Sequence, residues 1–296
     1  MSLIEEYKSS LKMAEAEEIL DLIFYRPIAF VFVKLIYRLP VSPNQVTFLS
    51  FVAGMLSAWC FAGGTDGAFA AAGAWYATAN MLDCGDGMLA RLQNSGSPFG
   101  RLVDGVVDWA ISVAIFVGLA IGLTTQTGNV LMWWLVMAGG LTSALHAFVF
   151  DYYQQEYISN VRGRHNFLSQ ELQRVTSELE TLTASRKGWG KRLALRVYLR
   201  YMELQSRSQF KEDLKTQAPP EMFRKYNLRI MQWWTVLGAT TNRTGLIVAA
   251  IAGRPDLFCW IVLIPGNLYL LFMLIWQHRV QRQLDNELRS SSGSDL

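Results

Sequence analysis

This sequence has few histidines and cysteines, and its net charge is small. The chain has three histidines and three cysteines among its 296 residues, and the cysteines are too widely scattered to form a metal motif. A zinc site built from histidine and cysteine is therefore not expected. The net charge of +3 gives no electrostatic support for binding nucleic acid. The amino terminus lacks a basic region followed by an apolar core and a cleavage site, so we expect no signal peptide.

Apolar residues, in contrast, are abundant. They make up 51% of the chain and gather into long runs, which is typical of membrane spans. A helix needs about 20 residues to cross a hydrocarbon core of about 30 Å. The predicted fold class is therefore all-α, a polytopic membrane protein with a bundle of six transmembrane helices. The six spans are predicted at about 44–62, 67–90, 101–124, 129–150, 232–252 and 257–277.

The stretch before the first predicted span is apolar but unsuited to crossing a membrane. Residues 19–39 carry four charged side chains, and each would cost a few kcal/mol at the bilayer centre. We predict instead that region 1–42 contains an amphipathic helix lying in the membrane interface. Phe30, Val31 and Ile36 would face the acyl chains.

Lysine and arginine are distributed unevenly between the two sides of the predicted bundle. The linkers placed outside the membrane hold one basic residue, Arg254. By the positive-inside rule, both termini and the active site should be cytoplasmic in a multi-pass plasma or cytoplasmic membrane protein. An even number of spans agrees with this orientation.

A polar segment at 151–231 interrupts the apolar pattern and is predicted to be a cytoplasmic helical insertion. Apolar residues recur within it at spacings of four, three, four and three, which indicates a narrow apolar stripe on a helix. The stripe fits a helical hairpin or a coiled-coil contact between two chains. It consists of Leu168, Leu172, Val175, Leu179 and Leu182. The predicted regions are 1–42 (interfacial), 43–150 (spans one to four), 151–231 (insertion), 232–278 (spans five and six) and 279–296 (cytoplasmic tail).

Four aspartates lie at helical spacing on either side of a short turn. Asp83 and Asp86 are three residues apart, and Asp104 and Asp108 are four apart, so each pair shares one face of its helix. The linker at 94–98 is rich in turn residues. We therefore expect two antiparallel neighbouring helices whose four carboxylates converge near the cytoplasmic end of the bundle.

Such a cluster needs positive charge, because unpaired carboxylates repel one another and are costly to desolvate. Arg91 and Arg101 are too few to neutralise all four. An all-oxygen acidic site suits Mg²⁺ or Mn²⁺, and two ions about 4 Å apart are a common arrangement for displacement at phosphorus. The small residues Gly87, Ala90 and Gly100 would let a ligand approach the backbone closely.

Residues 83–108 follow the order Asp-x2-Asp-Gly-x2-Ala-Arg-x8-Gly-x3-Asp-x3-Asp. This pattern resembles, at every signature position, the CDP-alcohol phosphotransferase (CDP-alcohol phosphatidyltransferase) family of integral membrane enzymes. The family has a six-span core with the motif on the second and third spans, facing the cytoplasm. The resemblance does not extend to the insertion at 151–231. Because members are often dimeric, a homodimer is expected.

The resemblance implies a role for each aspartate. Asp83, Asp86 and Asp104 would hold the metal ions. Asp108 would be a further metal ligand and the base that accepts the proton of the acceptor hydroxyl.

The resemblance also implies residues that bind the substrate. Gly87, Ala90 and Gly100 would line the cytidine site. Arg91 would lie near the phosphates of the donor or hold the acidic cluster.

Three further positions are candidates with open alternatives. Asn44 and Thr47 belong to a Pro-Asn-x-x-Thr element that either borders the nucleotide or caps a helix. Arg243 lies in the middle of the fifth predicted span, where a charge usually faces the protein interior. It would bind a phosphate or pair with an aspartate of the bundle. His146 is interpreted as a hydrogen-bonded packing residue.

The predicted function is transfer of a phosphatidyl-type group from a CDP-lipid, such as CDP-diacylglycerol, to a small alcohol with release of CMP, as in phospholipid biosynthesis. The alternative is a choline or ethanolamine phosphotransferase, with a soluble CDP-amino alcohol as donor and diacylglycerol as acceptor. An intramembrane prenyltransferase is disfavoured because all four aspartates lie within one short stretch. An ion-coupled transporter is disfavoured because no internal repeat is visible.

Overall fold

The computed structural model describes residues 5–7, 13, 15–93, 95, 98–162, 175–177, 179–181, 183, 192, 195–196, 199 and 218–292. Within these residues the chain is helical and contains no strand, which confirms the all-α prediction. Most of the predicted insertion lies outside the described residues. The apolar stripe proposed there is outside them at Leu168, Leu172 and Leu182.

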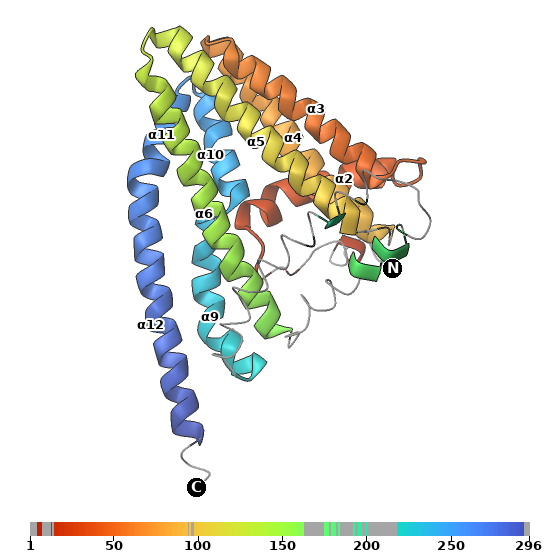
Figure 1. Cartoon of the computed structure of the whole chain (residues 1–296), viewed down its shortest axis with the longest axis vertical. Coiled ribbons are helices and arrows are strands. Elements are labelled where there is room, and N and C mark those ends of the chain that lie inside the picture. Colours follow the sequence, from red (N-terminus) through yellow and green to blue (C-terminus); the bar gives the residue numbers. More distant parts are fainter. Residues whose placement is uncertain are drawn as a thin grey trace.

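The amino-terminal half of the bundle is built from four long helices. They are α3 (Pro43–Ala62), α4 (Asp66–Leu92), α5 (Pro98–Thr127) and α6 (Leu131–Val161). Helix α3 packs along both α4 and α5, and α6 follows α5 after a tight turn at Gly128, whose φ of 66° suits glycine. Figure 1 shows α3, α4 and α5 side by side, with α6 running from the same end of the molecule toward its middle.

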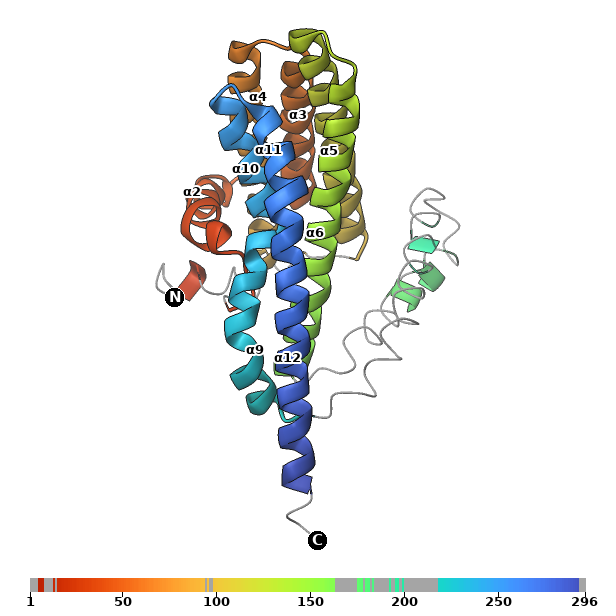
Figure 2. The same ribbon diagram turned by 90° about the vertical axis from the view of Figure 1, so that its left-hand side faces the viewer.

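The carboxyl-terminal half consists of shorter helices that lead into one long helix. Helix α10 packs on α4, and α12 runs beside α9 and extends well beyond the bundle (Figure 2). The elements are α9 (Pro220–Trp234), η2 (Thr235–Leu237), α10 (Ala239–Ile251), α11 (Pro255–Ile261), η3 (Val262–Gly266) and α12 (Asn267–Ser292). The predicted tail at 279–296 is therefore helical as far as Ser292, as a continuation of α12.

Four helical stretches of the described chain are long and apolar enough to cross a membrane. They match the predicted spans at 44–62, 101–124, 129–150 and 257–277, and they comprise Pro43–Ala62, Val103–Thr127, Leu131–Val161 and Pro255–Ser290. The chain is thus a membrane protein by composition and length of its helices. The other two spans of the six-span prediction, at 67–90 and 232–252, are not among the helices long and apolar enough to cross a membrane.

The expected fifth span differs most from the prediction. A single helix over 232–252 does not form, because the backbone is extended at Gly238 (φ −66°, ψ 162°) between η2 and α10. Helix α10 has 13 residues, or about 20 Å of length, against a hydrocarbon core of about 30 Å. Apolar residues continue across the break, so the hydropathy gave no sign of it.

The amino-terminal region forms η1 (Asp21–Tyr25) and α2 (Arg26–Ile36), which lie beside the bundle (Figure 2). Of the three residues predicted to face lipid, Val31 is 61% exposed. Phe30 and Ile36 are partly buried against the protein core, and contact of these two side chains with acyl chains stays a prediction. The location of α2 in a membrane interface stays a prediction.

Glycines on α5 allow α3 and α5 to approach closely. A Cβ atom at Gly118 would overlap the carbonyl oxygen of Ala58, and one at Gly122 would overlap that of Phe61. Backbone atoms in the middle of a helix cannot easily move aside. These two positions therefore set the distance between the two helices.

We expect Gly118→Ala to destabilise the protein by about 1–3 kcal/mol, because overpacking here acts against a backbone carbonyl. Gly67→Ala is the matched control, since a Cβ at that position has no neighbour within 4 Å. Thermal unfolding in detergent measures both variants. Equal changes in Tm for the two variants would contradict this account of the packing.

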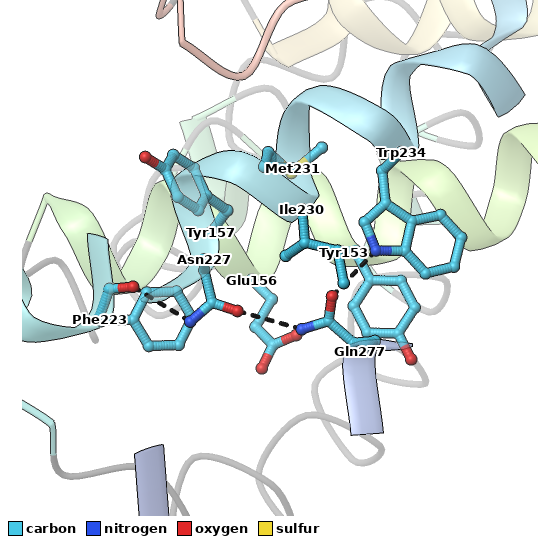
Figure 3. Close-up of a pocket in the computed structure, with 9 residues that line it drawn as sticks. All are labelled: Tyr153, Glu156, Tyr157, Phe223, Asn227, Ile230, Met231, Trp234 and Gln277. Atoms are coloured by element: carbon cyan, nitrogen blue, oxygen red, sulfur yellow. Dashed lines mark hydrogen bonds between the residues drawn. The ribbon is translucent and has the colours of Figure 1, made fainter. Parts of the chain in front are cut away.

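A buried polar network joins α9 to α12, and an aromatic stack joins α6 to α9 beside it (Figure 3). Trp234 donates to Gln277 (2.9 Å), and Gln277 donates to Asn227 (3.1 Å). The Tyr153 ring stacks on Trp234 with centroids 4.5 Å apart. Three of the residues that line the small cavity here, Asn227, Trp234 and Gln277, are therefore already paired with one another.

Candidate metal centre and active site

Helices α4 and α5 position the acidic residues, but they do not pack along one another as expected. Each packs along α3 instead, and in the described part of the chain α4 and α5 have few contacts with each other. The two predicted neighbours are thus separated by α3 over much of their length. Their acidic faces nevertheless meet where α4 ends and α5 begins.

Three of the four aspartates form a compact group of oxygen atoms. One carboxylate oxygen from each of Asp83, Asp86 and Asp104 lies within 4.8 Å of the others. Asp86 is almost fully buried, with 5% of its surface exposed. Three carboxylates this close repel one another unless a cation neutralises them. The donor set is the one that Mg²⁺ or Mn²⁺ prefers, so the group can hold a divalent metal ion.

Asp108 lies outside this group and is joined to it through Arg243. The Arg243 guanidinium makes an ion pair with Asp83 (3.0 Å) and another with Asp108 (2.9 Å). It also donates to Asn80 (2.9 Å). Of the two alternatives for Arg243, the structure has the pairing with aspartates of the bundle. A contact between Arg243 and a phosphate stays a prediction.

The start of α3 supplies a hydrogen bond to the acidic cluster. The Thr47 hydroxyl donates to Asp86 (2.5 Å), and both side chains are buried. Helix capping falls to other residues, since Gln45 accepts from the backbone N–H of Ser42 (2.8 Å). Asn44 is exposed in the first turn of the helix. In this element Thr47 therefore contacts the site, while a contact between Asn44 and a nucleotide stays a prediction.

The small residues of the motif are accessible from outside the protein. Gly87, Ala90 and Gly100 are all partly exposed. The Arg91 guanidinium lies over Gly87, with its nearest nitrogen 3.4 Å from the place of a Gly87 Cβ, and it interacts electrostatically with Asp86. Arg91 is thus near enough to help neutralise the cluster. The assignment of these four residues to substrate stays a prediction.

One residue of the site escaped the sequence analysis although its spacing gave a signal. Asn80 is 1% exposed and accepts from Arg243. It lies three residues before Asp83, so it shares the acidic face of α4. His146, as expected, is buried and hydrogen-bonded, with Asn267 as its partner (3.2 Å).

We expect Thr47→Val to weaken metal binding by about 10–100-fold, because hydrogen bonds to a metal ligand orient it. Ser50→Ala is the matched control. Ser50 also donates from α3 to α4, to the carbonyl of Ala79 (2.9 Å), without touching a carboxylate. Titration of purified protein with Mn²⁺ measures the affinity. Equal losses of affinity in both variants would show that Thr47 acts only through helix packing.

Comparison with known proteins agrees with this site. Residues 40–173 match the model of the CDP-alcohol phosphatidyltransferase family. Residues 40–173 are therefore assigned to a CDP-alcohol phosphatidyltransferase domain. This is a phosphotransferase family whose members use divalent metal ions and act on a CDP-alcohol donor and an alcohol acceptor, so the predicted phosphotransferase family is confirmed for residues 40–173.

A curated protein from Rubrobacter xylanophilus, the bifunctional IPC transferase and DIPP synthase, is 37% identical over 87 residues. The alignment covers 29% of this chain and 19% of that protein, so this chain corresponds to only a small part of that protein. The matched domain contains all four aspartates. It ends before α10, so the ion pairs of Arg243 are seen only in the structure.

Proposed function

We propose that the protein transfers a phosphatidyl-type group from CDP-diacylglycerol to a small alcohol, with release of CMP. The observation that carries the proposal is the group of carboxylate oxygens of Asp83, Asp86 and Asp104, all within 4.8 Å of one another in a protein with membrane-spanning helices. Such a location allows a lipid donor to reach the site from the bilayer and a polar acceptor to reach it from water.

Each acidic residue has a distinct role in this proposal. Asp83, Asp86 and Asp104 would hold Mg²⁺ or Mn²⁺, with two ions expected, and such ions would supply positive charge for the pyrophosphate of the donor. Asp108 accepts the proton of the acceptor hydroxyl. The acceptor oxygen then bonds to the phosphorus of the phosphatidyl group while the phosphoanhydride bond breaks, and CMP leaves with the bonding electrons.

Arg243 orients two of these carboxylates from a third helix. Its ion pairs with Asp83 and Asp108 are 3.0 Å and 2.9 Å long. A planar guanidinium can hold two carboxylates at a fixed separation. Arg243 would thereby place the base beside the metal site, and it can also bind a substrate phosphate when one enters.

The remaining residues of the motif are proposed to bind the donor. Close approach to the backbone at the small residues suits a flat base, and the guanidinium suits a phosphate. They are Gly87, Ala90 and Gly100 at the cytidine, Arg91 at the phosphates, and Asn44 and Thr47 at the border of the nucleotide.

The arrangement in the membrane is also a proposal. Four helices satisfy the length and hydropathy of spans, and α4 and α10 would cross with them to complete six. The excess of Lys and Arg in the segments 151–231 and 279–296 supports cytoplasmic termini and a cytoplasmic active site. We further propose that α2 lies in the membrane interface and that the protein is a homodimer.

A panel of acceptor alcohols tests the proposed function. Purified protein with Mg²⁺ and CDP-diacylglycerol is given inositol, inositol phosphate, glycerol phosphate, serine or choline, and release of CMP is measured. We expect release to depend on one class of acceptor and to be lost in Asp108→Ala. Release only from CDP-choline or CDP-ethanolamine with diacylglycerol would support the reversed polarity. No release from any donor would contradict a transferase of this kind.

A further inference from the structure

A short amino-terminal segment, residues 15–18, lies across several helices far from it in sequence. We name it the strap. The Glu15 carboxylate accepts from the Tyr157 hydroxyl (3.1 Å) and from Arg224 Nε (2.9 Å). The Ala16 carbonyl accepts from Gln154 (2.5 Å). The strap is thereby attached to α6 and α9.

Glu18, the last residue of the strap, reaches the first turn of α10. Its two carboxylate oxygens accept from the backbone N–H groups of Thr240 (3.0 Å) and Thr241 (2.8 Å). The Thr241 hydroxyl donates to the same carboxylate (3.0 Å). Glu18 is 5% exposed, so these bonds are shielded from water. The contact joins residues 222 positions apart in the sequence.

This contact provides a cap that α10 lacks on its own. The first N–H groups of a helix have no partner within it, and the residue before the helix usually supplies one from its side chain. Here that residue is Gly238, which has no side chain. A carboxylate also suits the positive end of the helix dipole. Glu18 therefore replaces the missing cap in both hydrogen bonding and charge.

The glycine at 238 makes room for this arrangement. A Cβ atom there would overlap the Glu18 carboxylate. A second contact, between the hydroxyls of Tyr25 and Thr244 (3.1 Å), holds the next turn of α10 to the amino-terminal region. The first two turns of α10 are thus fixed from outside the helix.

Arg243 lies within these two turns. It follows Thr240 by three residues, and its guanidinium is 15% exposed in its ion pairs with Asp83 and Asp108. If the first turn of α10 frayed or rotated, the guanidinium would move relative to both carboxylates. Displacements of about 1 Å at an active site can cost about 10²-fold in rate.

We propose that Glu18 is a positioning residue, whose carboxylate fixes the first turn of α10 so that Arg243 reaches Asp83 and Asp108. Its effect on turnover rests on the proposed function. Its effect on α10 does not.

The ionisation of Glu18 decides the conditions of the test. Burial and, to a smaller extent, the nearby Asp21 carboxylate raise the pKa of Glu18 to about 7, although the hydrogen bonds from Thr240 and Thr241 act to lower it. At about pH 8, above this pKa, the carboxylate is mostly ionised and able to accept all three hydrogen bonds. Variants are therefore compared at about pH 8.

The test compares Glu18→Gln with Glu15→Gln. The first replaces one accepting oxygen at α10 with an N–H donor, and the second makes the same change in the strap where it contacts α6 and α9. We expect Glu18→Gln to lower kcat by about tenfold or more with little change in KM, and Glu15→Gln to stay within about twofold of wild type. Hydrogen exchange at Thr240 and Thr241 should be faster only in Glu18→Gln.

A coupling measurement connects Glu18 with Arg243. If Glu18 acts through Arg243, the double variant Glu18→Gln/Arg243→Lys should lose about as much kcat as Arg243→Lys alone. If Glu18→Gln has wild-type kcat although hydrogen exchange at Thr240 and Thr241 is faster, the contact is only structural. If hydrogen exchange at these residues is unchanged, Glu18 does not hold the first turn of α10. Either result overturns the proposal.

The inference stays testable if the proposed function fails. If the wild-type protein releases no CMP, the same double variant is examined by thermal unfolding, which needs no turnover. Losses in Tm that are not additive support the link from Glu18 to Arg243. Additive losses overturn it.

Discussion

Replacing Asp86 with asparagine is expected to lower turnover by about 10³-fold or more, because a metal ion at phosphorus contributes several kcal/mol to the transition state. Asparagine keeps an oxygen that can accept from Thr47, so the fold around the site should survive. The change removes the charge of the most buried carboxylate of the metal group. Mn²⁺ titration should show the loss of affinity together with the loss of CMP release.

Asp66→Asn is the control for this variant. Asp66 also lies on α4, in its first turn, where it accepts from Gln126 (2.9 Å) at the opposite end of the helix. We expect wild-type turnover and metal affinity from this control. An Asp86→Asn protein that turned over normally at limiting metal would show that the cluster does not hold the reactive ion.

Arg243→Ala is expected to reduce both stability and turnover. Removing one partner of a buried ion pair costs about 3–5 kcal/mol, because it leaves uncompensated charge. Here Asp83 and Asp108 would lose the cation that bridges them. Turnover should fall by about 10²-fold, because the base is no longer fixed beside the metal site. Arg243→Lys should be intermediate, since an ammonium cannot bridge two carboxylates as a guanidinium does.

Arg254→Ala provides the matched control. Arg254 pairs with Asp256 (2.9 Å), but its side chain is 60% exposed. An exposed ion pair contributes about 0–1 kcal/mol, so Tm and turnover should hardly change. Saturating Mg²⁺ should restore part of the Tm lost in Arg243→Ala, because the metal then neutralises Asp83. No loss of Tm in Arg243→Ala, with or without metal, would contradict the bridging role.

The helical period predicted the part of the site that is local in sequence. Asp83 and Asp86 share a face of α4, and a short linker brings Asp104 close to them. The same rule would have found Asn80, three residues before Asp83. The order of the residues in the motif at 83–108 also predicted the family, and the match over residues 40–173 confirms it.

Contacts between distant segments could not be predicted in this way. Both α4 and α5 pack along α3, so the spacing between the acidic helices depends on the close approach of α3 to Gly118 and Gly122. The cap of α10 comes from Glu18, and neither Glu18 nor Gly238 has a local signal for it. The fifth predicted span was wrong for a related reason. Hydropathy is averaged over many residues, so it does not detect a single break in a helix such as the one at Gly238.

Metal-dependent release of CMP tests the central claim most directly. Purified protein is stripped of divalent cations with a chelator, given CDP-diacylglycerol and its acceptor alcohol, and titrated with Mg²⁺ or Mn²⁺ while CMP is measured. The wild-type protein should release no CMP until metal is added, and Asp86→Asn should not recover at the same metal concentration. Full release of CMP with every divalent cation chelated would contradict the claim that these carboxylates act through a bound metal ion.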